Sequence, residues 1–217
     1  LKEILKSMCS KPILIVAGEP KSIFLEIFFK TLKLKKIKTP LILICSKKLL
    51  ISQMKKLGFK MNISDLDLNK LHVYKLNNQS INIIDINLNS DNLNIINPII
   101  SNSYIQNSFN VAFKLIKKNF TDKLINGPIS KKTFFNGKFL GVTEMLAKQF
   151  KTEKIAMLIY NKKLAVCPIT THLPLKLVSK KISENLIIEK IILINNFYKK
   201  MFKYKPKIAI LGLNPHC

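Results

Sequence analysis

Short apolar runs alternate with longer amphipathic stretches along this chain. Residues 12–17 (PILIVA) and 41–45 (LILIC) are such runs, and each precedes a stretch whose pattern is that of a helix. Short apolar runs next to turn residues are typical of buried strands, whereas apolar residues three or four apart are typical of one helix face. Strands that alternate with helices predict an α/β fold class.

The same patterns give bounds for the expected elements. Strands are expected at 12–17, 41–45, 72–75, 81–86, 155–160, 164–169 and 208–213, and helices at 22–34, 47–57, 101–120, 143–150 and 183–202. The predicted inward side chains are Phe24, Ile27, Phe28 and Leu32 in the first helix, and Ile105, Phe109, Ala112 and Ile116 in the third. The polar turn 161–163 favours a hairpin, and Ser183 is expected to cap the last helix. No repeat or low-complexity linker appears, so no internal boundary is predicted within 1–217.

The net charge of +25 raises the question of a nucleic-acid partner, because phosphate neutralisation drives such binding. All 37 basic residues are lysine, however, whereas base readout and bidentate phosphate contacts favour arginine. The chain is also rich in Ile and Asn, which, like Lys, AT-rich genomes encode readily. The composition therefore favours a lysine-rich solvated surface without a nucleic-acid partner. A basic nucleic-acid-associated protein stays as the alternative from another functional class.

Cysteine usage and hydropathy bear on the compartment. The four cysteines, Cys9, Cys45, Cys167 and Cys217, are far apart and form no CxxC pair. This pattern fits reduced thiols in a cytosol better than a disulfide framework. No apolar stretch is long enough to cross a membrane, and no signal-peptide pattern follows Leu1. We therefore expect a cytoplasmic protein with no membrane partner.

Two of the three histidines follow predicted strands. His172 comes after the strand at 164–169, and His216 comes after the strand at 208–213. Ligands bind at the carboxyl edge of open α/β sheets, and neutral imidazoles are common ligands of divalent metals. The two side chains are therefore candidate metal ligands, although from spacing alone two loop histidines without a metal are the simpler interpretation. A catalytic metal needs a third ligand from elsewhere. His72 is expected to be structural.

Two glycine-containing loops are candidate anion sites. Residues 127–131 (GPISK) follow an expected strand at 123–126, and a turn with a hydroxyl and Lys131 suits a phosphate or a carboxylate, although a plain strand-to-helix turn is the simpler interpretation. Residues 141–144 (GVTE) open a helix, where the Thr143 hydroxyl and the helix start either face an anion or simply form the N-cap. Neither GxGxxG nor a P-loop is present, so these residues alone do not indicate a nucleotide cofactor.

Five segments resemble, in order and rough spacing, the 4-hydroxythreonine-4-phosphate dehydrogenase family. They are 18–20 (GEP), 127–131 (GPISK), 141–144 (GVTE), 170–175 (TTHLPL) and 212–216 (GLNPH). The first three resemble the family's opening loop, its Gly-Pro turn with a lysine, and its GHTE loop. The last two match the family motifs in full. The resemblance spans the whole chain.

The resemblance implies a fold like that of isocitrate and isopropylmalate dehydrogenases, with two α/β lobes around a cleft, incomplete in this chain. It also implies NAD- or NADP-dependent oxidation of 4-phosphooxy-L-threonine at its 3-hydroxyl. The resulting β-keto acid loses carbon dioxide to give 3-amino-2-oxopropyl phosphate, a step in the synthesis of vitamin B6.

The resemblance also implies roles for particular residues. His172 and His216 match the family's ligands of a divalent metal, which is zinc, magnesium or cobalt, and Thr143 matches a residue that binds the phosphorylated amino-acid substrate. In the family a third histidine comes from the partner subunit, so a homodimer with a shared active site is implied. That histidine and most of the dinucleotide site lie beyond residue 217 in the family.

Three departures from the family pattern matter. The opening loop lacks the later family glycines, Val142 replaces a substrate-binding histidine, and the chain stops at Cys217 where the family continues. We therefore interpret residues 1–217 as part of a dehydrogenase, and expect this fragment alone to be inactive. Val142 also leaves open a related metal-dependent dehydrogenase that acts on another phosphorylated hydroxy acid.

Overall fold

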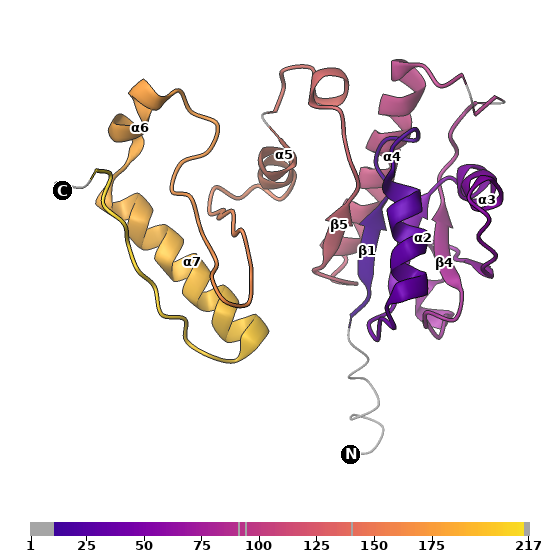
Figure 1. The fold of residues 1–217 in the computed structure, drawn as a ribbon, viewed down its shortest axis with the longest axis horizontal. Coiled ribbons are helices and arrows are strands. Elements are labelled where there is room, and N and C mark those ends of the chain that lie inside the picture. Colours follow the sequence, from indigo (N-terminus) through magenta and orange to yellow (C-terminus); the bar gives the residue numbers. More distant parts are fainter. Residues whose placement is uncertain (1–10, 91, 94, 140, 215–217) are drawn as a thin grey trace, which may run out of the picture. The chain divides into compact units, whose positions relative to one another are not determined.

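The structure is a computed structural model that describes residues 11–90, 92–93, 95–139 and 141–214. The chain groups into two compact units, residues 1–136 and residues 137–217. The first unit contains a parallel sheet with helices, and the second contains helices and extended segments (Figure 1). The predicted α/β class is confirmed. The described helices include no segment with the length and apolarity needed to cross a bilayer.

The sheet of the first unit has five parallel strands. They are β1 (Ile13–Val16), β2 (Leu41–Cys45), β3 (Ile63–Asp65), β4 (Ile81–Asp85) and β5 (Leu124–Asn126), in the spatial order β3-β4-β2-β1-β5. From β1 the chain builds the sheet outward to β4, and it then crosses back to place β5 on the other side of β1. The strand order therefore reverses between β1 and β5. Ligands of open α/β sheets bind at such a switch point, outside the carboxyl ends of the strands.

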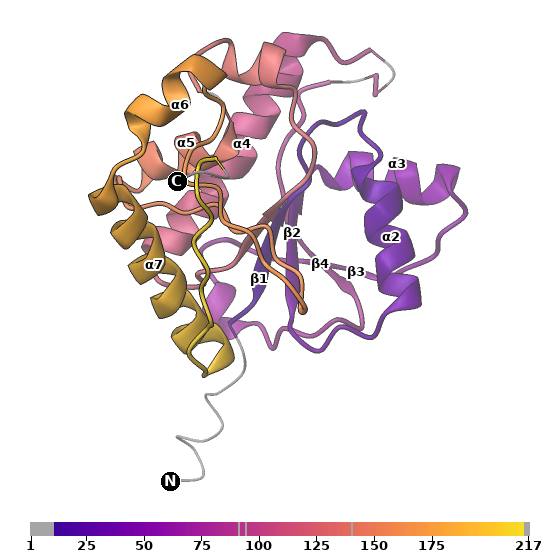
Figure 2. The same cartoon turned by 60° about the vertical axis from the view of Figure 1, so that its left-hand side comes forward.

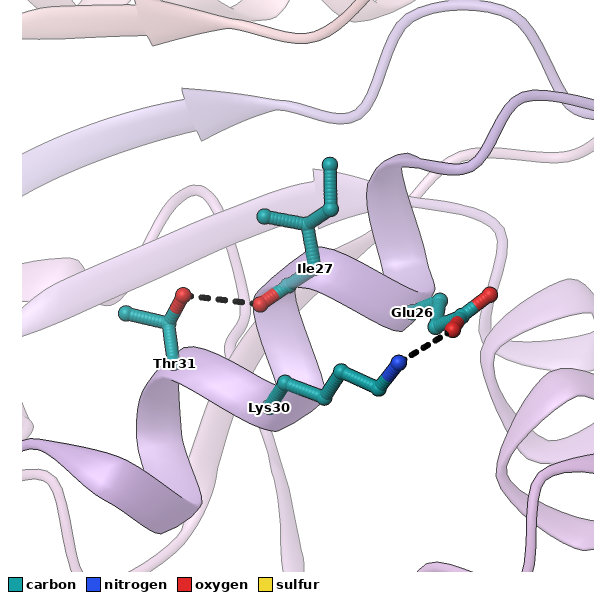
Figure 3. A network of polar contacts seen from close by, with 4 residues as sticks. All are labelled: Glu26, Ile27, Lys30 and Thr31. Carbon is teal, nitrogen blue, oxygen red and sulfur yellow. Dashed lines mark hydrogen bonds and ion pairs between the residues drawn. The ribbon is translucent and has the colours of Figure 1, made fainter.

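Helices cover both faces of this sheet. α2 (Phe24–Leu34) and α3 (Lys47–Lys56) lie on one face, and α4 (Pro98–Lys117) lies on the other (Figure 2). The buried side of α2 is formed by Leu25, Phe28 and Phe29. The prediction that Ile27 faces inward is wrong, because the wide apolar stripe of α2 is centred on Phe28–Phe29 and leaves Ile27 at 51% exposure. Figure 3 shows the solvent side of α2, where Glu26 pairs with Lys30 at 2.5 Å.

Among the helices α2, α3 and α4, the helix α4 contributes the most buried residues. Its buried side includes Ile105, Phe109 and Ala112, as the spacing predicts. The helix begins three residues earlier than expected, because the Asn97 side chain accepts a hydrogen bond from the Ile100 N–H and Pro98 occupies the first turn. An Asn cap followed by Pro is a strong helix start. This start lies at the end of the Asn-rich connection from β4.

One predicted strand of the first unit is wrong. Residues 72–75 do not form a strand, because Leu71–Val73 is a short 3-10 helix (η1) that leaves His72 exposed. The missing strand is β3, which pairs with β4 at the edge of the sheet. It has three residues and one exposed side chain, so it shows neither the length nor the apolar run on which strand prediction depends.

The second unit contains α5 (Val142–Gln149), α6 (Leu175–Lys181) and α7 (Glu184–Phe202). The two strands predicted around the turn at 161–163 are reduced to a single antiparallel bridge between Ile159 and Val166. Residues 208–213 are extended but belong to no strand, so that prediction is wrong. Apolar sequence favours an extended backbone, but a strand also needs a neighbour to pair with its N–H and C=O groups.

Candidate functional site

Two loops meet at the carboxyl edge of the sheet, beside the switch point. The loop after β1 contains Gly18 and Glu19, and the loop after β5 contains Gly127 and Pro128. The Glu19 N–H donates to the Pro128 carbonyl at 2.9 Å, and the Gly127 N–H donates to the Val16 carbonyl at 2.7 Å. The two segments singled out in the sequence as GEP and GPISK are therefore neighbours.

Glycine is required on both sides of this contact. A Cβ atom at Gly18 would lie 2.3 Å from the Pro128 oxygen, and Gly18 also has a φ of +78°. A Cβ atom at Gly127 would lie 2.1 Å from the Ala17 oxygen. Backbone atoms cannot yield at these distances without moving the strands, so the absence of side chains fixes how closely the loops approach.

The Glu19 carboxylate is held by groups from two other segments. Its Oε2 accepts a hydrogen bond from the Ser101 hydroxyl at 2.6 Å, and its Oε1 accepts one from the Ser130 N–H at 3.3 Å. Ser101 lies in the first turn of α4, and Ser130 precedes the π-helical turn η2 (Lys131–Phe135). The carboxylate is therefore fixed in position at the sheet edge, although it is only half-buried.

A pocket of about 250 Å³ opens beside this carboxylate. Its walls come from the loop after β1, the start of α4 and the start of η2, and the residues are Glu19, Pro20, Lys21, Ile96, Asn97, Pro98, Ser101, Ser130 and Thr133. We call it the Glu19 pocket. It combines one carboxylate, several hydroxyls, one ammonium group and an apolar wall. This combination suits a small ligand that has both hydrogen-bond donors for the carboxylate and a negatively charged group for the ammonium.

Further hydrogen bonds lie at the same sheet edge, where β2 ends, and they extend from the buried Tyr104 side chain to the exposed Asp85 carboxylate. The Tyr104 hydroxyl accepts a hydrogen bond from the Ser46 N–H at 3.1 Å, and the Lys47 N–H donates to Asp85 at 2.8 Å. Burial raises the pKa of the Cys45 thiol far above its ordinary value, and the Asp85 carboxylate raises it further. A thiol held in this protonated form is a poor nucleophile. These hydrogen bonds therefore support the sheet edge, and Cys45 is not a reactive cysteine.

In the second unit, Thr143 lies in the first turn of α5. The N-cap is Gly141, which makes no side-chain hydrogen bond, so the interpretation of Thr143 as the cap is wrong. The first N–H groups of α5 thus have no side-chain acceptor from the N-cap residue, and the half-buried Thr143 shares the first turn with Glu144. Free N–H groups at a helix start attract anions. The substrate role of Thr143 stays a prediction.

The two predicted metal ligands have different standings. His172 is exposed on a loop before α6, with a φ of +57°, and the segment 164–169 directly before it contains an isolated bridge at Val166 but no strand. The argument that placed it after a strand is therefore wrong, and its predicted role now depends on the TTHLPL motif. His216 lies outside the described residues. Among the described residues, no three His, Cys, Asp or Glu side chains group as metal ligands.

Comparison with known proteins gives a consistent result. The sequence profile of the family described as "Pyridoxal phosphate biosynthetic protein PdxA" matches residues 36–217. The 4-hydroxythreonine-4-phosphate dehydrogenase of a Sulfurihydrogenibium species is 45% identical over 108 residues, which are 48% of this chain and 34% of that protein. The enzyme of the same name from Aquifex aeolicus is 45% identical over 76 residues, which are 35% of this chain and 24% of that protein.

Two solved structures share the fold. The 4-hydroxythreonine-4-phosphate dehydrogenase of Klebsiella pneumoniae superposes with a TM-score of 0.81 at 24% identity, covering 97% of this chain and 65% of that one. The enzyme of Burkholderia phymatum gives 0.77 at 23% identity, covering 94% and 63%. The chain thus spans less than two thirds of these structures, and its matches cover about a third or less of the curated relatives. Because the family profile matches most of its length, the chain belongs to the PdxA family of pyridoxal phosphate biosynthetic proteins.

Proposed function

We propose that this protein takes part in the NAD- or NADP-dependent oxidation of 4-phosphooxy-L-threonine. The product is a β-keto acid that loses carbon dioxide to give 3-amino-2-oxopropyl phosphate, a precursor of pyridoxal phosphate. The observation that carries the proposal is family membership over residues 36–217 together with the complete motifs at 170–175 and 212–216. The relatives and solved structures that match carry the name of this enzyme.

The start of α5 is the proposed contact for the substrate. Its first N–H groups and the positive end of the helix dipole favour a phosphate or carboxylate, and the Thr143 hydroxyl adds a donor beside them. Val142 supplies no imidazole at the position where the family has one. Substrate recognition at this point therefore depends on Thr143 and the backbone.

His172 and His216 are the proposed ligands of a divalent metal, zinc, magnesium or cobalt. The His172 imidazole is exposed and has no hydrogen-bond partner among the described residues, so a ring nitrogen is available to a metal. When bound, such a metal supplies Lewis acidity that polarises the reacting hydroxyl. The contribution of the protein is to hold the hydroxyl and the substrate phosphate in one orientation.

A homodimer in the cytoplasm is proposed as the working form. Leu164 and Leu211 of the second unit are 72% and 89% exposed, respectively, in an isolated chain. Burial of such side chains against another chain would be favourable. A second copy is the proposed partner, as the resemblance implies.

A related reaction is the second candidate. Val142 replaces a histidine of the family pattern and presents an apolar side chain in the first turn of α5. A site with one polar contact fewer favours a different phosphorylated hydroxy acid. Comparing the affinity of the chain and of a Val142→His variant for 4-phosphooxy-L-threonine and for such analogues distinguishes the two, because restoring the imidazole strengthens binding of 4-phosphooxy-L-threonine only if that compound is the natural substrate.

The metal proposal is tested with cobalt(II), whose visible absorption reports imidazole ligands. We expect His172→Ala and His216→Ala each to weaken cobalt binding at least about tenfold. His72→Ala is the matched control, because His72 is also an exposed histidine but lies in the other unit. Equal affinity in all three variants would show that the TTHLPL and GLNPH histidines do not share a metal.

A further inference from the structure

We propose that the Glu19 pocket binds the ribose diol and the 5′-phosphate of a nucleotide. The inference rests on the proposed function in one respect, namely that the nucleotide is then the NAD or NADP cofactor. The sequence gives no cofactor-binding residue, since no GxGxxG is present. The assignment depends on the geometry around one carboxylate in the first unit.

The Glu19 carboxylate can accept two more hydrogen bonds. Among the described residues, each of its oxygens accepts one hydrogen bond, from the Ser101 hydroxyl or from the Ser130 N–H. A carboxylate oxygen has two lone pairs, so each keeps one acceptor position. Two vicinal hydroxyls match two adjacent carboxylate oxygens, and a carboxylate that accepts from a ribose hydroxyl is a recurrent feature of dinucleotide sites. Hydrogen bonds to an ionised acceptor are also stronger than neutral ones.

The rest of the pocket fits the other parts of a nucleotide. Lys21 also lines the pocket, and its positive charge favours a phosphate nearby. Pro20, Ile96 and Pro98 form an apolar wall against which a flat ring can pack. The volume of about 250 Å³ is smaller than that of a site for a whole drug-sized ligand. One ribosyl phosphate with part of its base is therefore the expected occupant.

The position of the pocket supports the same class of ligand. It lies at the carboxyl edge of the sheet, between the loops that follow β1 and β5, where the strand order reverses. Nucleotides bind at this kind of crevice in open α/β sheets. The tight contact of Gly18 with Pro128 keeps the loop that carries Glu19 in place before a ligand arrives.

The charge of Glu19 also predicts a selectivity. A phosphate ester on the diol would place a dianion against the carboxylate and remove one donor hydroxyl. A ribose with a free diol is therefore accepted, and a 2′-phosphorylated ribose is rejected. AMP and NMN share the recognised chemistry, because both carry a free ribose diol and a 5′-phosphate. AMP contains the adenosine ribose of the cofactor and NMN contains the nicotinamide ribose, so comparing their binding shows which ribose enters the pocket. Only the adenosine ribose carries the extra phosphate of NADP.

The test is a titration of the isotopically labelled 217-residue chain with AMP, NMN and 2′-phospho-AMP, followed by amide chemical shifts. At least one of the first two should shift the amides of the loop 18–21, Ser101 and Ser130, whereas 2′-phospho-AMP should not. Glu19→Gln keeps the size of the side chain and removes its charge, and it should weaken binding about tenfold. Ser101→Ala should weaken it less, since it frees the carboxylate without removing it.

Glu26→Gln is the matched control. Glu26 pairs with Lys30 on α2 (Figure 3) and does not line the pocket, so the variant makes the same change of net charge without altering the pocket wall. If Glu26→Gln and Glu19→Gln alter affinity equally, the basic chain attracts anions without a site and the proposal is overturned. The absence of shifts at these amides with both nucleotides also overturns it. The cobalt experiment on His172 and His216 does not involve this pocket, so either proposal can fail without the other.

Discussion

Gly18 and Gly127 allow the loops after β1 and β5 to approach closely at the sheet edge, because neither residue has a Cβ atom. Each would direct a Cβ atom into the backbone of the opposite loop, at 2.3 Å and 2.1 Å, respectively. Gly58 provides a contrast, because it has a φ of +70° but no atom within 4 Å of its Cβ position. Substitutions at the three positions therefore distinguish the loss of folding free energy caused by a close contact from the loss caused by a left-handed backbone.

Alanine at these positions should destabilise the chain to different degrees. Gly58→Ala should cost about 1 kcal/mol from φ strain alone. Gly18→Ala should cost about 3 kcal/mol, because overpacking adds to the same strain. Urea denaturation of both variants measures the difference. Equal losses would mean that the loop after β5 moves aside without cost, and the close contact would then be irrelevant to the position of Glu19.

Part of the site at this scale follows from the sequence and part does not. The GEP and GPISK segments stand out because each follows an apolar run and contains glycine. The hydrogen bond between Glu19 and Ser101 cannot be predicted from the sequence. Ser101 is 82 residues from Glu19 and lies among other serines and asparagines of α4. A single hydroxyl in a polar helix start has no pattern of its own, and only the crossover from β4 to β5 brings it to the carboxylate.

Two helix starts in the second unit differ in how their N–H groups are satisfied. At α7 the Ser183 hydroxyl accepts from the Leu186 N–H at 3.3 Å, as the sequence predicts. At α5 the cap is Gly141, and the Thr143 hydroxyl makes no hydrogen bond with a described residue. The first start has a capping side chain, whereas the second has none at its N-cap residue and carries the Glu144 carboxylate in its first turn.

Alanine substitution should therefore lower stability at the start of α7 and substrate affinity at the start of α5. Ser183→Ala removes a cap and should lower the free energy of unfolding of the second unit by about 1 kcal/mol. Thr143→Ala should change it by less than about 0.5 kcal/mol, yet weaken 4-phosphooxy-L-threonine binding by about 1–2 kcal/mol. Thermal unfolding and calorimetric titration provide the two readouts. A Thr143→Ala variant that is destabilised but binds normally would assign Thr143 to the fold alone.

Elements are predictable to the extent that their own sequence determines them. The strands β1, β2 and β4 are apolar runs buried in the sheet, and their bounds agree with prediction within two residues at either end. Residues 208–213 are equally apolar, yet they have no strand beside them within the described chain. Sequence indicates the preference for an extended backbone, but pairing is a property of the neighbours.

At the scale of the whole chain, the two units differ in how much apolar surface they bury. The first unit has a core in which Leu14, Val16 and Ile42 have no exposed surface. In the described part of the second unit, Met145 and Tyr198 are the apolar residues that count as buried. Burial of apolar area is the main source of folding free energy, so the units should differ in stability.

Hydrogen exchange should show this difference residue by residue. Amides of β1, β2 and β4 should exchange only through global unfolding of the first unit, because both faces of their sheet are covered. Amides of the extended segments 155–169 and 207–213 should exchange at least about 100-fold faster, since few of them have backbone partners and Leu211 is 89% exposed.

If a second copy is the partner, raising the protein concentration should slow exchange in these two segments and leave β2 unchanged. Concentration-independent exchange throughout would exclude self-association through them, and equal protection of both units would contradict the difference in burial.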